Sequence, residues 1–267
     1  MTDFAAFSAL PDERMDVLVG ALLIAKDEYA GLDVERERAR VDAIAEPVGR
    51  LEGYGAEAQA TKLAEHLFVT LGFRGNADEY YDPRNSFLND VLDRRLGIPI
   101  SLSLLYTEVA RRVGIVASGV SFPGHFLVRI ERESGDPLVV DPFNSGRVVG
   151  RPTLESMLPD GRRLDRSALV AAKPRAILQR MLVNLKGIYA TRGELSRLLV
   201  VLSRLLELDP GLIEDRRDRG FIAMRLGSRD VAESDLRRYL ELAPEAGDAP
   251  EVRRMLSRLK SRPSRAN

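Results

Sequence analysis

Apolar residues recur every three to four positions through roughly the first 73 residues, a spacing that predicts helices. The pattern is clearest at Met15–Leu23, at residues 36–51 and at residues 56–71. A helix with one apolar stripe buries that stripe in a core, so we expect three amphipathic helices. His66 lies in the third segment, with no other histidine or cysteine close to it in sequence. We therefore interpret His66 as a structural residue and not as a metal ligand.

Two further helices are expected on either side of residue 97. Ser86 precedes the apolar run 87–96, and Ser101 precedes the apolar run 102–113. Serine is a favoured N-cap residue, so each serine is predicted to cap the helix that follows it. Gly97 is predicted to end the first helix, as a glycine in the left-handed conformation does.

After Gly114 the period of the apolar residues changes to two, which indicates β-strands. Residues 125–130 alternate as one strand, and Leu138–Asp141 follows a polar turn as the returning strand. Arg147–Val149 adds a third short strand. The predicted fold class is therefore α+β, with a small antiparallel sheet beside the helices.

Beyond Lys173–Pro174 the chain is helical again, and it repeats itself. Arg204–Pro210 recurs as Arg238–Pro244 at an offset of 34 residues, and Gly193 recurs as Gly227 at the same offset. This is the period of tetratricopeptide repeats, in which pairs of antiparallel helices stack. The sequence therefore predicts an all-helical tetratricopeptide-type segment, and a plain helical bundle is the alternative.

The 267 residues carry 40 basic and 40 acidic side chains, so no net charge draws the chain to nucleic acid or to an anionic membrane. We expect neither partner, and interpret the basic helix at 253–262 as a solvated capping helix, with a nucleic-acid or membrane contact as the alternative. The absence of cysteine excludes disulfides and thiol chemistry. Without a signal-peptide pattern or an apolar run of bilayer length, a cytoplasmic protein is expected.

His125 and Asp141 are the candidate catalytic residues. A helix, then a histidine on a strand, then an aspartate on the next strand is the order of a Cys-His-Asp enzyme. In such an enzyme the carboxylate orients the imidazole, which takes the proton of the thiol. The thiol is missing here. Two histidines, no His-Glu-x-x-His spacing and no glycine-rich phosphate loop predict no metal and no nucleotide cofactor.

Four short motifs follow one another along the chain: Tyr80–Ser86, Gly97–Leu102, Pro123–Val128 and Asp141–Phe143. In these motifs and in the repeats, over roughly residues 40 to 245, the chain resembles the bacterial SirB-type family. That family has a transglutaminase-like domain followed by tetratricopeptide repeats. The resemblance implies a papain-like core, with the transglutaminase-like domain at 1–172 (core 80–150), the repeats at 173–262 and a flexible tail at 263–267.

The resemblance also implies roles for single positions. His125 and Asp141 match the histidine and aspartate of the family, whereas Pro99 falls where active enzymes carry the nucleophilic cysteine. Proline has no nucleophilic atom, and it has no backbone N–H to offer an oxyanion. For the function, the resemblance implies a link to regulation.

We therefore expect a non-catalytic regulatory module that binds a protein or peptide through the repeat groove or the degenerate cleft. The alternatives are a hydrolase or acyltransferase that uses Ser101 or Ser103 with His125 and Asp141, and a purely structural module. The side chains expected to contact a ligand are Tyr80, Tyr81, Arg84, Asn85 and Asn144. A well hydrogen-bonded loop is the alternative for this aromatic and polar segment, and a buried structural hydrogen bond is the alternative for the His–Asp pair.

Overall fold

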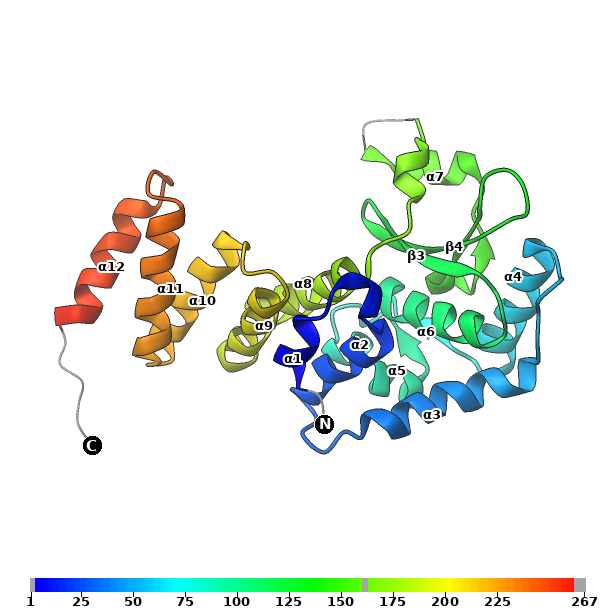
Figure 1. The fold of residues 1–267 in the computed structure, drawn as a ribbon, viewed down its shortest axis with the longest axis horizontal. Coiled ribbons are helices and arrows are strands. Elements are labelled where there is room, and N and C mark those ends of the chain that lie inside the picture. The colour runs from blue at the N-terminus through cyan, green and yellow to red at the C-terminus, as the bar shows by residue number, and fades with distance from the viewer. Residues whose placement is uncertain (1–2, 160–162, 262–267) are drawn as a thin grey trace. The chain divides into compact units, whose positions relative to one another are not determined.

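The computed structural model describes residues 3–159 and 163–261, which form two compact units that divide between Met181 and Leu182 (Figure 1). The boundary falls inside helix α8 (Pro174–Arg192), later than the 172/173 division expected from the sequence. The first turns of α8 belong to unit 1 because Leu178 packs directly against Gly20, where a Cβ atom would lie 2.6 Å from the leucine.

Unit 1 begins with helices, as the apolar periodicity predicts. They are α1 (Phe4–Ser8), α2 (Val17–Lys26), α3 (Val34–Ala45), α4 (Ala56–Ala64) with a π-helical continuation (Glu65–Thr70), α5 (Leu88–Arg94) and α6 (Pro99–Arg112). His66 donates a hydrogen bond from Nε2 to the main-chain oxygen of Ile44, 2.8 Å away. The interpretation of His66 as a structural residue is therefore confirmed.

The main sheet of unit 1 is antiparallel, with its strands in chain order. They are β3 (Ala117–Phe122), β4 (His125–Ile130), β5 (Leu138–Asp141) and β6 (Arg147–Val148). A two-residue parallel pair, β1 (Arg74–Gly75) and β2 (Leu96–Gly97), lies apart from it. The sequence does not predict strand β3, because Ser118, Gly119 and Ser121 interrupt the alternation of apolar and polar residues there. Pairing with β4, from Ala117–Ile130 to Phe122–His125, makes it a strand.

Helix α6 packs against β3 and β4. Helix α7 (Arg151–Met157) contributes to a hydrophobic core on the sheet. This core includes Leu154 of α7 and buried side chains of three strands, namely Val120, Phe122, Leu127 and Val139. The fold class is α+β, as predicted.

Three predicted helix ends lie elsewhere, and each prediction is corrected by the structure. Helix α5 begins at Leu88, so Ser86 does not cap it, and Arg95 rather than Gly97 takes the left-handed conformation at its end, with φ of 58°. Gly97 lies in β2, where a Cβ atom would come within 2.8 Å of Ser101 Oγ. Helix α6 begins at Pro99 instead of Leu102, because the fixed φ and missing N–H of proline suit the first helical position.

Unit 2 continues from α8 with helices whose positions repeat. They are α9 (Leu195–Leu208), α10 (Ile213–Arg225), α11 (Arg229–Leu242) and α12 (Ala249–Ser261). The bounds of α9 and α11 differ by the predicted 34 residues, and Gly193 and Gly227 precede them with φ of 67° and 80°. The prediction of tetratricopeptide-type helices is confirmed over that of a plain bundle.

One position departs from the repeat for a visible reason. Gly220 is small because a Cβ atom there would lie 2.7 Å from Leu236. The equivalent residue one repeat earlier is Lys186, whose Nζ binds Asp215 and Asp218 of α10 at 2.7 and 2.9 Å. An ion-pair link between α8 and α10 therefore occupies the place where the pattern expects a small residue.

Candidate functional site

His125 and Asp141 meet at one end of the two central strands of the sheet, at the start of β4 and the end of β5. Their side chains form a hydrogen bond of 3.0 Å between Nε2 and Oδ1. Because an ionised carboxylate only accepts, Nε2 is the donor of this bond, and Nδ1 is the ring nitrogen that is not bonded to Asp141. Nδ1 has no hydrogen-bond partner in residues 3–159 and 163–261, and 13% of the side chain is exposed. The pair thus presents one free ring nitrogen.

Asp141 is held in place from its other side by Asn144. The aspartate is 1% exposed, and its Oδ2 accepts a hydrogen bond of 2.7 Å from Nδ2 of Asn144. The main-chain N–H of Asn144 donates to Oδ1 at 3.3 Å, in the short 3₁₀ turn Pro142–Asn144. Asn144 therefore supports the aspartate, and it is itself exposed, so its predicted contact with a ligand stays a prediction.

These contacts predict an acid-dependent stability. Burial raises the pKa of Asp141, but the hydrogen bonds from His125 and Asn144 outweigh burial and lower it below its usual value. The stabilisation is present above the unfolded-state pKa of about 3.9 and is lost as pH falls through the folded-state value. We expect Asp141→Asn to lower the free energy of urea unfolding at pH 7, with the difference from wild type shrinking below about pH 4. A difference that stays constant with pH would contradict this account.

The serines at the start of α6 point their hydroxyls at the main chain. Ser101 is fully buried, and its Oγ donates to the Asn85 oxygen at 2.6 Å and accepts from the Ile98 N–H at 3.0 Å. Ser103 is equally buried, and its Oγ lies 3.4 Å from the main-chain oxygen of Phe126. No serine of the described chain forms a hydrogen bond with the His125 ring.

A row of aromatic rings runs from the protein surface to His125. The ring centroids of Tyr81 and Tyr80 are 5.3 Å apart, those of Tyr80 and Phe143 are 6.0 Å apart, and those of Phe143 and His125 are 6.2 Å apart. Each pair meets edge to face, the geometry that aromatic rings favour. Tyr81 is 73% exposed at the outer end. We call Tyr81, Tyr80, Phe143 and His125 the aromatic row.

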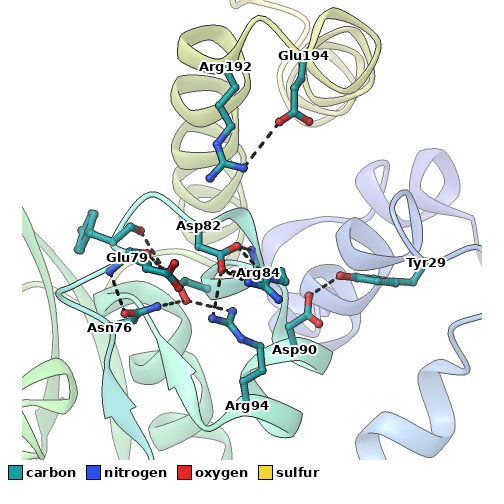
Figure 2. A network of polar contacts seen from close by, with 11 residues as sticks. Tyr29, Asn76, Glu79, Asp82, Arg84, Asp90, Arg94, Arg192 and Glu194 are labelled. Carbon is teal, nitrogen blue, oxygen red and sulfur yellow. Dashed lines mark hydrogen bonds and ion pairs between the residues drawn. The ribbon is translucent and has the colours of Figure 1, made fainter.

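Arg84 belongs to a different arrangement, a polar network that holds the loop before α5 (Figure 2), and Asn85 joins this network through Arg94. Asp82 is buried between two arginines, and its Oδ2 lies 2.7 Å from Arg84 and 3.2 Å from Arg94. Burial raises the pKa of Asp82, but the hydrogen bonds and charges of these arginines lower it overall. These contacts fix the conformation of the loop at Asp82 and Arg84.

Asn85 is completely buried within this network, so the prediction that it contacts a ligand is wrong. Its Nδ2 donates to the main-chain oxygens of Glu79 and Tyr80, and its Oδ1 accepts from Asn76 and Arg94. Every polar atom of the amide is thereby used inside the protein. Asn85 thereby holds the main chain of the loop at Glu79 and Tyr80.

Arg180 of α8 joins the site although no local pattern marks it. Its Nη2 donates to the main-chain oxygen of His125 at 2.8 Å, across 55 positions of sequence. Burial raises the pKa of Tyr80 above its usual value, and the charge of Arg180 offsets part of that rise. Only the packing of α8 against the β3–β4 hairpin brings these residues together.

In residues 3–159 and 163–261, no three histidine, cysteine or carboxylate side chains cluster as a metal site would require. No helix of this part of the chain has the length and apolar character needed to cross a membrane.

Comparison with known families defines the class of protein. The pattern of the transglutaminase-like superfamily matches residues 35–183, and that of the tetratricopeptide repeat matches residues 185–257. A transglutaminase-like domain followed by tetratricopeptide repeats is the organisation that the resemblance to the SirB-type family implies. The chain belongs to the UPF0162 family within this class.

Individual relatives carry this assignment. The chain is 43% identical to a UPF0162 protein of Xylella fastidiosa over 259 residues, which cover 93% of this chain and 91% of that protein. It is 29% identical to UPF0162 protein PA3419 of Pseudomonas aeruginosa over 269 residues, which cover 98% and 97% of the two chains. Human F-box only protein 21 is 29% identical over 226 residues, covering 72% of this chain and 35% of that protein.

Proposed function

We propose that this chain is a non-catalytic regulatory module of the cytoplasm that binds a protein or peptide at the aromatic row or through its tetratricopeptide repeats. The observation that carries the proposal is the pairing of His125. One ring nitrogen is held by Asp141, and the other has no hydrogen-bond partner in the described chain. The ring lies beside the half-buried Phe143, which leads through Tyr80 to the exposed Tyr81. A site of this kind has the means to accept a hydrogen bond and to pack an apolar group.

The rest of the chain supports binding over catalysis. It contains no cysteine, and Pro99 begins the helix at the position where the resemblance places the nucleophile. Ser101 and Ser103 are engaged with main-chain atoms, so a serine would have to leave these bonds to act as a nucleophile. Tetratricopeptide helices are a common platform for protein partners.

The binding test uses selection of displayed random peptides on the full-length protein. We expect selected peptides to lose about tenfold in affinity with Tyr81→Ala, since truncation of an interface aromatic costs about 1–2 kcal/mol. His125→Ala is expected to weaken them similarly. Tyr54→Ala is the matched control, because Tyr54 is 49% exposed in unit 1 but lies outside the aromatic row. Peptides that bind all three variants as they bind wild type would refute the site.

The catalytic alternative is tested separately with a fluorophosphonate probe and mass spectrometry. We expect no labelled serine in the wild-type chain. A label on Ser101 or Ser103 that disappears with His125→Ala would identify a serine hydrolase or acyltransferase and overturn the proposal.

A further inference from the structure

Arg180 is fastened to the end of the β3–β4 hairpin by neutral acceptors. Its Nη1 donates to Ser121 Oγ at 2.6 Å and to the Phe122 oxygen at 3.3 Å, and its Nη2 donates to the His125 oxygen at 2.8 Å. The guanidinium also lies over the ring of Phe126, 5.5 Å from its centroid. These contacts hold the cation in one orientation beside His125.

Two donors of this guanidinium are left over. A guanidinium has five N–H groups, and the hydrogen bonds above use three of them. The Nε–H and one N–H of Nη2 have no acceptor in the part of the chain that the structure describes. Nε and Nη2 lie on one side of the planar guanidinium, and this is an edge through which arginine binds a carboxylate by two parallel hydrogen bonds.

The charge of Arg180 is also unmatched. No carboxylate lies within ion-pair distance of it among residues 3–159 and 163–261. Asp141, at the same end of the sheet, accepts hydrogen bonds from His125 and Asn144 instead. Arg129 on β4 offers a contrast, because it binds the Leu169 oxygen at 2.7 Å and is also paired with Glu131 at 2.7 Å.

Burial makes this imbalance costly. Burial removes part of the hydration of the guanidinium and so lowers the pKa of Arg180 from its usual value. A cation that has lost water without gaining an anion is less stable than one that is paired. The tyrosine nearby does not supply that anion, since burial raises the pKa of Tyr80 and keeps its hydroxyl neutral.

We infer that Arg180 and His125 form a carboxylate subsite, in which the free edge of the guanidinium binds the carboxylate of a peptide while the aromatic row packs a neighbouring apolar side chain. The inference rests on the proposed function and names the chemistry of its ligand. The carboxylate comes either from the C-terminus of the peptide or from an acidic side chain. His125 accepts a hydrogen bond from the same ligand through Nδ1.

The experiment is an NMR titration of the full-length protein labelled at histidine. The chain has only two histidines, and His66, tied to the Ile44 oxygen, serves as the internal reference. The probe is N-acetyl-phenylalanine, and its neutral amide is the matched control ligand. We expect the ring signals of His125, but not those of His66, to shift saturably with the acid, and the amide to bind about tenfold more weakly.

Variants assign the effect to the guanidinium. Arg180→Gln is expected to bind the acid and the amide equally, whereas Arg180→Lys keeps part of the preference because it keeps the charge. Arg129→Gln is the matched control and keeps the full preference. Unshifted His66 signals report that each variant is folded. Equal binding of acid and amide by the wild-type protein, or an acid preference that survives Arg180→Gln, would overturn the subsite.

A third probe distinguishes the source of the carboxylate. N-acetyl-aspartyl-phenylalaninamide has an acidic side chain and a blocked C-terminus. If it binds, the subsite accepts a side-chain carboxylate. If it does not bind while N-acetyl-phenylalanine does, the subsite requires a C-terminal carboxylate. Failure of the proposed function is distinguishable. If the small acids bind as expected but no displayed peptide does, the subsite stands and the peptide-binding role fails. If peptides bind but acid and amide do not differ, the subsite alone fails.

Discussion

Replacing Asn85 with alanine is expected to lower the free energy of unfolding of unit 1 by about 3 kcal/mol. The amide is fully buried and bonds four partners from one loop and one helix: the main-chain oxygens of Glu79 and Tyr80, and the side chains of Asn76 and Arg94. Alanine leaves these groups without a partner in a place that water reaches poorly. Hydrogen exchange of residues 76–94 is expected to accelerate along with the loss measured in urea.

Asn89 provides the matched control four residues further along. Its Oδ1 is buried without a hydrogen-bond partner in the described chain, so Asn89→Ala removes no satisfied acceptor. We expect this variant to change the unfolding free energy by less than about 0.5 kcal/mol. Equal losses for the two variants would show that the polar network does not stabilise the loop.

The second large effect is expected at Asp235, in unit 2. Asp235 is 1% exposed on α11, and it binds Arg219 of α10 through both carboxylate oxygens, at 2.6 and 2.8 Å. Arg216 approaches it as well, at 3.5 Å. Asp235→Ala leaves two largely buried guanidinium groups without their anion, so we expect a loss of about 3 kcal/mol in the unfolding free energy.

Urea unfolding followed by circular dichroism measures this loss, and hydrogen exchange in α10 and α11 locates it. Glu233→Ala is the control on the same helix, because Glu233 pairs with Arg237 at the surface. An exposed pair contributes little, and we expect less than about 0.5 kcal/mol there. If Asp235→Ala were as mild as Glu233→Ala, the buried ion pair would not hold the two helices together.

Predictions from the sequence succeeded where a period governs the structure. Alternation identified the strand that carries His125, a polar turn identified the returning strand that carries Asp141, and the 34-residue offset identified α9 and α11. The predictions failed where one residue type can have several structural roles. Ser86 resembles an N-cap and is not one, because the helix begins two residues later at Leu88. Gly97 resembles a helix end, but it is needed for close packing against Ser101.

The site shows the same division. The order of His125 and Asp141 along the chain is enough to expect their hydrogen bond, since neighbouring strands bring such residues together. The same loop motif contains both Asn85, which is buried, and Tyr81, which is exposed, and no sequence rule separates them. Arg180 lies on a helix that has no motif in common with the strands it contacts.

The sequence by itself determined the class of fold, the repeats and the absence of a thiol, because each depends on composition or on a local period. Only the tertiary structure decided which polar side chains are used inside the protein and which face outward. A side chain such as that of Arg180 acquires its surroundings from elements that are distant in sequence, and its free guanidinium edge exists only after α8 has packed on the hairpin. Hydrogen bonds and charges at the site depend on that packing, whereas the elements themselves depend mainly on their own residues.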